Sequence, residues 1–338
     1  MRQMFKIMKE KLQAGENLVL VTVTAASGAT PRGTGARMLV GKEGRIYGTI
    51  GGGAVEYRSE QIAKEVLESK SSIQRDFSLT KNDVQNLGMI CGGAVEVFFH
   101  YIPAGDPSVI RLAEAAEEKF AAGEALWLLS DIGHGGTLSL YTKKDGFLGH
   151  DCPEWMAGEL SGKPKHVVMN GENFCVEQIN SSGRVYIFGC GHVSQELEPV
   201  LTHVGFRCVV MDDRPEFANR ELFPGAEEVK VIDFTRIEDY ISITSDDYVC
   251  IMTRGHAHDT VLQAQVLKKS PCYVGVIGSR HKAASVRKTL KEEYGMMDAE
   301  LDLVTTPIGL TIKAETPAEI AISIAGQMIQ VRAELGKK

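Results

Sequence analysis

The residue with the most distinctive chemical potential in this sequence is Cys91, a thiol directly followed by Gly92 and Gly93. The two glycines leave little side-chain bulk on the C-terminal side of the sulfur, which suits a thiol that contacts a soft metal, carries sulfur or attacks as a nucleophile. No adjacent histidine or lysine lowers its pKa, so the fold or a ligand would have to activate it. A small buried side chain in a tight turn is the alternative, and the local sequence favours neither.

Cys91 lies in the second copy of a short near-repeat. Residues 50–56 are IGGGAVE and residues 90–96 are ICGGAVE, so the copies differ at one position. Consecutive glycines suit a place where the backbone comes close to a ligand or to another backbone, because they carry no side chain. Glu56 and Glu96 close the two copies. Each could act in acid–base chemistry or contact a ligand, although a glutamate at a turn is more often solvated.

A second set of candidates follows the short apolar run Val185–Phe188. Gly189 would permit a tight turn, and Gly191 would let a phosphate approach the backbone at the start of the next helix, whose free N–H groups favour an anion. Ser194 replaces the usual third glycine, so we expect looser packing between this helix and the strand. Pro199 lies inside the expected helix and predicts a kink.

Two acids, Asp212 and Asp213, end the next apolar run and are followed by Arg214. They lie 23 and 24 residues after Gly189, close to the roughly 20 at which an acid that bonds a ribose hydroxyl is expected in a dinucleotide-binding fold. The strand–turn–helix–strand–acid order supports such a fold. It leaves open whether the turn holds a nucleotide, because a bare scaffold can keep the same turn.

Three other loops carry candidate ligands. The loop Ser27–Arg37 is rich in glycine and hydroxyl groups, and it could wrap an anion or be an ordinary connection with solvated arginines. The loop Thr253–Asp259 contains His256 and His258, which could bind a metal, transfer protons, or bond backbone or phosphate. The segment Gly278–Lys282 opens a helix with basic residues. The helix dipole disfavours cations there, a conflict that a bound anion or simple solvent exposure would resolve.

These candidates need a parallel sheet to bring them together. After residue 184 the apolar runs alternate with amphipathic segments, which is typical of such a sheet, whose ligands lie beyond the carboxyl ends of its strands. The predicted strands are Val185–Phe188, Phe206–Met211, Glu228–Ile232, Asp247–Met252 and Cys272–Ile277. Helices are predicted after Gly191, near Thr235–Ile241, at Asp259–Lys268, from Arg280, and from a capping box at Thr316–Glu319. Four turns should therefore converge on one edge, namely Gly189–Ser194, Asp212–Arg214, Thr253–Asp259 and Gly278–Lys282.

The N-terminal half predicts a mixed pattern. A helix is expected over Phe5–Leu12, Tyr57–Ser69 and Ser108–Ala122, and strands over Leu18–Thr24, Met38–Val40, Val95–Ile102 and Ala125–Leu129. Short β-like pieces follow at Thr137–Thr142, His166–Met169 and Asn173–Ile179 before a linker at residues 180–183. The predicted fold class is α/β, with an N-terminal α+β domain over residues 1–180, including a β-rich extension, and a C-terminal Rossmann-like domain with a parallel sheet over residues 184–338.

Composition narrows the functional classes. The net charge of −7 argues against a general nucleic-acid or anionic-membrane binder. Seven scattered cysteines without a CxxC pair indicate neither a disulfide framework nor a zinc site. The apolar runs are strand-sized and the first residues are charged, so we expect neither a membrane helix nor a signal peptide, and a cytoplasmic location.

Together these motifs resemble the XdhC/CoxI family, the accessory factors of xanthine dehydrogenase and related molybdenum hydroxylases. The resemblance is carried by Pro31-Arg32 with Gly35-Ala36, residues 50–56 and 91–96, residues 189–193, Asp212-Asp213-Arg214, the Gly255–Asp259 loop, Gly278-Ser279-Arg280, residues 307–310 and Thr316-Pro317. Residues 130–183 match least. The chain departs from the family pattern at Cys190, Arg254, Thr311 and Lys313.

The resemblance implies that the protein carries a molybdenum cofactor of the molybdopterin type. A role as a carrier is expected more than a role as a catalyst. Such a protein would protect the cofactor while a cysteine desulfurase supplies its sulfido ligand, and would pass it to a hydroxylase such as xanthine dehydrogenase. Cys91 would contact molybdenum or sulfur, and the Rossmann-like half would hold phosphate or a nucleotide such as NAD. The implied cofactor-binding residues are Arg32, Gly51, Gly52, Gly53, Glu56, Gly92, Gly93, Glu96, Gly189, Gly191, His192, Ser194, Asp212, Asp213, Arg214, His256, Ser279 and Arg280.

Two other functions remain open on the sequence. An NAD(P)-dependent oxidoreductase would use residues 189–213, and a structural partner of the hydroxylase would use the two domains only as a docking surface. The sequence does not decide the cofactor variant, the client hydroxylase, or whether the protein forms a homodimer.

Overall fold

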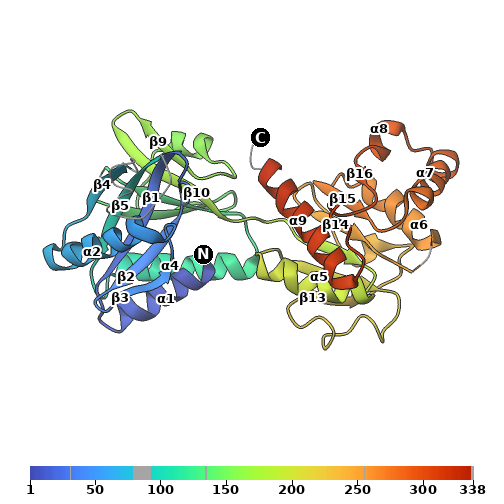
Figure 1. Cartoon of the computed structure of the whole chain (residues 1–338), viewed down its shortest axis with the longest axis horizontal. Coiled ribbons are helices and arrows are strands. Elements are labelled where there is room, and N and C mark those ends of the chain that lie inside the picture. Colours follow the sequence, from blue (N-terminus) through green and yellow to red (C-terminus); the bar gives the residue numbers. More distant parts are fainter. Residues whose placement is uncertain (31, 79–92, 134, 255, 336–338) are drawn as a thin grey trace. The chain divides into compact units, whose positions relative to one another are not determined.

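A computed structural model describes residues 1–30, 32–78, 93–133, 135–254 and 256–335 (Figure 1). Cys91 and Gly92 lie outside the described residues. The chain divides into two compact units, Met1–Ser181 and Ser182–Lys338. Each unit has its own hydrophobic clusters, and each is described by itself.

The first unit is built on a five-stranded antiparallel sheet in the order β3-β2-β1-β5-β4 (Figure 1). Its strands are β1 (Leu18–Gly28), β2 (Arg37–Gly41), β3 (Gly44–Gly48), β4 (Ile73–Ser78) and β5 (Gly93–Ile102). Successive side chains of β1 point to opposite faces. Val19, Val21 and Val23 therefore pack with α2 (Gly53–Ser69), whereas Leu18 and Leu20 pack with α1 (Arg2–Gln13) and α4 (Pro107–Ala122).

A second antiparallel sheet belongs to the same unit. It has the order β8-β7-β6-β10-β9 and consists of β6 (Leu126–Asp131), β7 (Thr137–Thr142), β8 (Gly146–Gly149), β9 (Lys165–Met169) and β10 (Glu172–Asn180). A 3-10 helix spans Glu154–Glu159 between β8 and β9. Leu126, Leu128, Leu138 and Leu140 join the cluster that α1 and α4 form with the first sheet. The two sheets thus share a core through these helices.

The second unit is a six-stranded parallel sheet in the order β13-β12-β11-β14-β15-β16. Its strands are β11 (Val185–Phe188), β12 (Cys208–Asp212), β13 (Glu228–Val231), β14 (Tyr248–Ile251), β15 (Tyr273–Val276) and β16 (Val304–Thr305). In chain order this is 3-2-1-4-5-6, the Rossmann order, so the predicted Rossmann-like fold is confirmed.

Helices cover both faces of this sheet (Figure 1). Val185 and Ile187 pack against α5 (His192–His203) and α9 (Pro317–Leu335). Tyr186 and Phe188 point to the other face, which α6 (His256–Leu267), α7 (Arg280–Tyr294) and α8 (Asp298–Leu301) cover. The predicted capping box is confirmed, because the Glu319 carboxylate accepts from the Thr316 N–H at 2.9 Å and the Thr316 hydroxyl accepts from the Glu319 N–H at 3.3 Å.

The predicted helix at Thr235–Ile241 is wrong. The structure has only a short 3-10 turn at Ile237–Asp239. The backbone groups of this segment find partners outside a helix: the Ile237 N–H donates to the Gln265 side chain at 3.1 Å, and the Tyr240 carbonyl accepts from Lys230 at 3.1 Å. With Ile237 as its buried anchor, the segment gains little from a longer helix.

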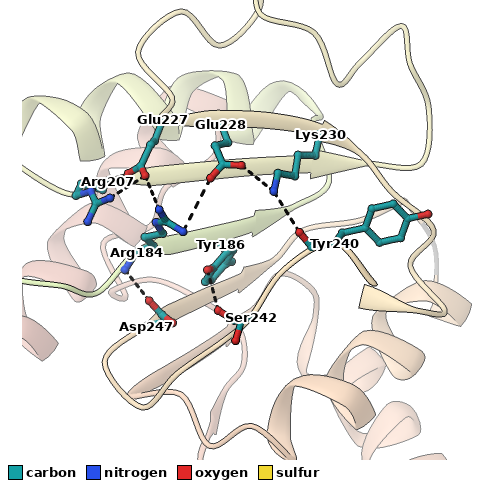
Figure 2. Close-up of polar contacts among 9 residues, drawn as sticks. All are labelled: Arg184, Tyr186, Arg207, Glu227, Glu228, Lys230, Tyr240, Ser242 and Asp247. Carbon is teal, nitrogen blue, oxygen red and sulfur yellow. Dashed lines mark hydrogen bonds and ion pairs between the residues drawn. The ribbon is translucent and has the colours of Figure 1, made fainter. Parts of the chain in front are cut away.

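Ion pairs close the edge where the parallel strands begin, as Figure 2 shows. Glu227 accepts from Arg184 and from Arg207, each at 2.7 Å, and Lys230 pairs with Glu228 at 2.7 Å. The Asp247 carboxylate accepts from the Arg184 N–H at 2.7 Å. The polar groups drawn at this edge are therefore paired with one another.

Candidate functional site

The glycine and arginine loops of the first unit leave from one end of its antiparallel sheet. β1 ends at Gly28, β2 begins at Arg37, β3 ends at Gly48 and β5 begins at Gly93. Because neighbouring strands are antiparallel, these four positions lie at the same end. The topology therefore gathers Arg32, the glycines at 51–53 and Gly93 at that end.

The glycine turn at residues 51–53 is held in an unusual backbone conformation. Gly51, Gly52 and Gly53 have φ values of 130°, 74° and 61°. Gly52 caps α2 without a side-chain hydrogen bond at the helix N-terminus. A Cβ atom built at Gly52 would meet no atom within 4 Å. The outer side of the turn is thus open, and the helix N-terminus behind it favours an anion.

Glu56 shapes this turn from inside. Its buried carboxylate accepts from the Ile50 N–H at 3.0 Å and the Gly52 N–H at 3.1 Å, and it also bonds the Thr49 hydroxyl and the Arg45 guanidinium. Burial alone would raise the pKa of Glu56, but these hydrogen bonds and the charge of Arg45 outweigh it and lower the pKa. In this structure Glu56 therefore supports the turn.

Gly93 lies where the start of β5 presses against the loop that follows β1. A Cβ atom there would approach the Ser27 carbonyl oxygen to 2.5 Å and the Ala29 carbonyl oxygen to 2.7 Å. Any side chain would push these backbones apart. Glu96 lies further along β5, and its partly exposed carboxylate accepts from Gln74 at 3.2 Å.

A buried ion pair, not anticipated from the sequence, supports the arginine loop. The Arg37 guanidinium is buried, bonds the Glu177 carboxylate of β10, and donates to the Gly35 carbonyl at 3.0 Å. Burial lowers the pKa of Arg37. Gly35 itself is confined, since a Cβ atom would meet Pro164 at 2.7 Å. Arg32, by contrast, is exposed at the tip of the loop.

The glycine turn of the second unit has the geometry expected of a Rossmann turn. Gly189 has a φ of 101°, and a Cβ atom there would come within 2.4 Å of the Met252 carbonyl oxygen. At Gly191 a Cβ atom would meet nothing within 4 Å, and α5 starts there without a side-chain cap. Ser194 is buried and its hydroxyl bonds the Gly189 carbonyl, whereas His192 is exposed.

The acids at the end of β12 have different surroundings. The Asp212 carboxylate is almost fully buried and accepts from the Cys190 N–H at 2.8 Å and the Arg214 Nε at 2.8 Å. Burial would raise the pKa of Asp212, but the hydrogen bonds, above all from Arg214, lower it. Asp213 is partly exposed, with 39% of its side-chain surface accessible. The more accessible carboxylate at this edge is therefore that of Asp213.

The remaining two turns reach the same edge. Thr253 donates to the fully buried Asp259 carboxylate at 2.5 Å, and Lys282 forms an ion pair with that carboxylate. His258 lies 3.9 Å from Asp213. These contacts, with those of Gly189 and Asp212, confirm the predicted convergence for the described residues. The cation at the start of α7 is balanced by Asp259, and Ser279 caps this helix by accepting from the Lys282 N–H at 3.2 Å.

Other predicted site residues are less defined. Arg280 is exposed at the first turn of α7, and the side chain of His256 is not described. Over the described ranges, no group of three or more histidine, cysteine, aspartate or glutamate side chains is arranged to hold a metal ion. Nothing in the sequence indicates the Arg37–Glu177 and Lys282–Asp259 pairs, because their partners are far apart along the chain.

Fold and site together define a two-part protein with a glycine-turn unit and a Rossmann unit, and two family profiles match it in that order. The profile of the XdhC and CoxI family matches residues 11–78, and that of the XdhC Rossmann domain matches residues 185–328. The chain belongs to the XdhC/CoxI family, which confirms the resemblance noted in the sequence.

Similar proteins extend over nearly the whole chain. It is 24% identical over 330 residues to a Bacillus subtilis (strain 168) protein named as a probable xanthine dehydrogenase component, covering 95% of each chain. It is 23% identical over 344 residues to the molybdenum cofactor insertion chaperone PaoD of Escherichia coli (strain K12), covering 98% of this chain and 88% of that protein.

A solved structure shows the same fold. The crystal structure of a xanthine dehydrogenase from Bacillus halodurans matches with a TM-score of 0.78 at 23% identity, covering 98% of this chain and 96% of the other. Among the described residues, no helix is both long and apolar enough to cross a membrane.

Proposed function

We propose that this chain is an accessory factor of a molybdenum hydroxylase of the xanthine dehydrogenase type, and that it binds the molybdenum cofactor before insertion. The observation that carries the proposal is the open, preshaped glycine turn at residues 51–53, in a chain similar to a molybdenum cofactor insertion chaperone over 98% of its length. A molybdopterin cofactor carries a phosphate, and an uncapped helix N-terminus behind a glycine turn suits such an anion.

In this proposal the Gly53 N–H donates to the phosphate, because the Gly52 N–H is already bonded to Glu56 at 3.1 Å, and Arg32, exposed at the same sheet end, supplies positive charge. Glu56 holds the turn and Gly93 keeps the start of β5 close to the loop after β1. The bound cofactor would supply the molybdenum and its sulfur chemistry. Cys91 precedes this part of β5 in the chain, and its contact with molybdenum or sulfur stays a prediction.

The second unit is proposed to hold a nucleotide or the nucleotide extension of the cofactor. Gly191 leaves open space at the start of α5, and Asp213 offers a partly exposed carboxylate at the next strand end. This arrangement supports phosphate at the turn and a ribose at the acid. The same observations are what an NAD-dependent oxidoreductase would need, so NAD titration belongs to the test.

A maturation assay tests the function. In cells that lack this protein, we expect the client hydroxylase to accumulate with little activity, and the wild-type gene to restore it. A Gly52→Ala variant should restore much less, because a side chain would occupy the open turn and strain a backbone conformation that glycine favours. Full hydroxylase activity without the protein would rule the proposal out.

Sulfuration of the cofactor and the alternative docking role need separate measurements. Sulfuration by a cysteine desulfurase predicts that the purified protein and the desulfurase associate, and that Cys91→Ala lowers the sulfido content of the delivered cofactor. A purely structural docking role predicts instead that Cys91→Ala leaves complex formation with the hydroxylase unchanged and that no cofactor binds.

A further inference from the structure

A cleft between α7 and the parallel sheet of the second unit has no part in the proposed function. Its volume is about 290 Å³, close to the lower end of the range for small-molecule sites, about 300–1,000 Å³. The apolar lining comes from Val276 of β15, Val286 and Leu290 of α7, Leu301 at the end of α8, and Val304 of β16. The cleft is thus a slot with a sheet on one side and helices on the other.

The sequence of α7 explains why the slot exists. Over 15 residues this helix buries Val286 and Leu290, and the residues that face the slot one turn earlier are Ala283 and Ala284. Two small side chains at this level leave space that leucine or isoleucine would fill. The small side chains of α7 are therefore the reason for the gap.

Polar groups line the slot beside the carboxyl end of β15. Lys282 carries an ammonium with three donors, of which one serves its ion pair with Asp259. Thr306 adds a hydroxyl, and Gln263 donates its amide N–H to the Asp259 carbonyl at 3.0 Å. In the described part of the chain nothing donates to the Gln263 amide oxygen. These three side chains offer donors from Lys282 and Thr306 and an acceptor from Gln263, while Arg287 and Asp302 line the same cleft as an ion pair.

The charges of the side chains that line the cleft indicate which kind of ligand it can bind. The charge of Lys282 is balanced by Asp259, and that of Arg287 by Asp298 at 2.6 Å and Asp302 at 2.8 Å. With both cations paired, a phosphate or carboxylate would find no uncompensated positive charge. A neutral planar ring satisfies the slot better, because its faces can lie against the aliphatic side chains and its edge can exchange hydrogen bonds.

We infer that this cleft binds a neutral, planar heterocycle with an amide-type edge, of the size of a nucleobase or a pterin ring. A ring carbonyl would accept from Lys282 and Thr306, and a ring N–H would donate to Gln263. The cleft lies next to the glycine turn: Gly189 packs on Met252, the neighbouring Thr253 bonds Asp259, and Asp259 pairs with Lys282. The ring can thus belong to a free compound or to a larger molecule held at that turn.

Calorimetric titration of the full chain tests the inference with uncharged probes, namely adenosine, guanosine, cytidine and neopterin, and with inorganic phosphate as a charged comparison. We expect guanosine or neopterin, whose rings carry a carbonyl next to an N–H, to bind at one site per chain, and adenosine and cytidine, which lack that pair, to bind more weakly. Ala283→Leu should weaken that binding at least roughly tenfold by filling the slot. Thr306→Val should weaken it less, by removing one donor without adding bulk.

Ser285→Leu is the matched control, because Ser285 lies on the same helix, is exposed and does not line the cleft. It should bind as the wild type does. Ring binding that Ala283→Leu leaves intact, no binding of any ring at millimolar concentration, or phosphate binding in place of ring binding would each overturn the inference. Such a failure leaves cofactor binding at residues 51–53 untouched, since that site lies in the other unit.

Discussion

Glu56 determines the conformation of the glycine turn in the first unit more than any glycine does by itself. Three glycines can adopt positive φ in many combinations, and the buried carboxylate selects one by accepting from the N–H groups of Ile50 and Gly52. The residue predicted as a ligand contact therefore acts in this structure as an internal support.

Replacement of Glu56 tests that role. Glu56→Gln keeps the shape but loses the charge-assisted hydrogen bonds, so the free energy of unfolding should fall by about 1–3 kcal/mol at pH 7. Trp127 and Trp155, the two tryptophans of the chain, both lie in the first unit, so tryptophan fluorescence during urea unfolding reports this unit. Glu65→Gln, at an exposed position of the same helix, should change the free energy of unfolding little.

The stabilisation that the Glu56 carboxylate contributes should decrease at low pH. The pKa of Glu56 is lowered in the folded chain from its ordinary value of 4.5, so its stabilisation is present above pH 4.5 and is lost as the pH falls through the folded pKa. The stability difference between wild type and Glu56→Gln should therefore shrink below pH 4.5. A difference that stays constant through this range would contradict the role given to the carboxylate.

At the scale of elements, α6 and α7 are joined by a buried charge. Asp259 at the start of α6 is fully buried, and Lys282 at the start of α7 is its cationic partner. Removing one member of such a pair leaves the other charge unpaired in the interior, which costs much more than removing both.

Lys282→Met should therefore destabilise the second unit by roughly 3 kcal/mol, and the double variant Lys282→Met with Asp259→Asn should recover part of the loss. Far-UV circular dichroism during urea unfolding of residues 182–338 would measure both. Lys288→Met on the exposed side of the same helix should cost less than about 0.5 kcal/mol. Equal losses in the single and double variants would show that the ion pair is not the cause.

Elements with a strong local pattern were predicted well from the sequence. The strand Val185–Phe188, the turn at Gly189 and the helix after it combine an apolar run, glycines and an amphipathic stripe within a few residues. The segment Thr235–Ile241 has helix-forming residues but a single buried anchor, and its backbone bonds go to Gln265 and Lys230, which local sequence does not indicate.

The sequence predicted those features of the candidate site that depend on the order of strands and helices. The convergence of four turns follows from alternating strands and helices, because parallel strands end at one edge. The side-chain contacts in the two units did not follow from the sequence. In the first unit Arg37 pairs with Glu177 of another sheet, and in the second the Asp212 carboxylate bonds the Cys190 and Arg214 N–H groups while Asp213 stays accessible. Such choices depend on packing between segments that are distant in sequence.

At the scale of the whole molecule, the chain consists of two compact units with separate cores. The clusters around α1, α2 and α4 involve residues before Ser181, and those around the parallel sheet involve residues after Ser182. A unit with its own core can fold alone. Fragments Met1–Ser181 and Ser182–Lys338 should each be soluble and unfold cooperatively in urea. An unfolded fragment would show that its unit depends on the other.

The measurement that tests the central claim most directly is anaerobic binding of the molybdenum cofactor, followed by cofactor fluorescence and bound molybdenum. The wild type should bind about one cofactor per chain, and Gly52→Ala should weaken binding at least roughly tenfold. Gly15→Ala, which places a methyl group at another glycine of positive φ with open space around it, should bind as the wild type does. Cys91→Ala should also weaken binding if the thiol contacts the cofactor. No binding by the wild type, or equal binding by Gly52→Ala and Gly15→Ala, would contradict the account.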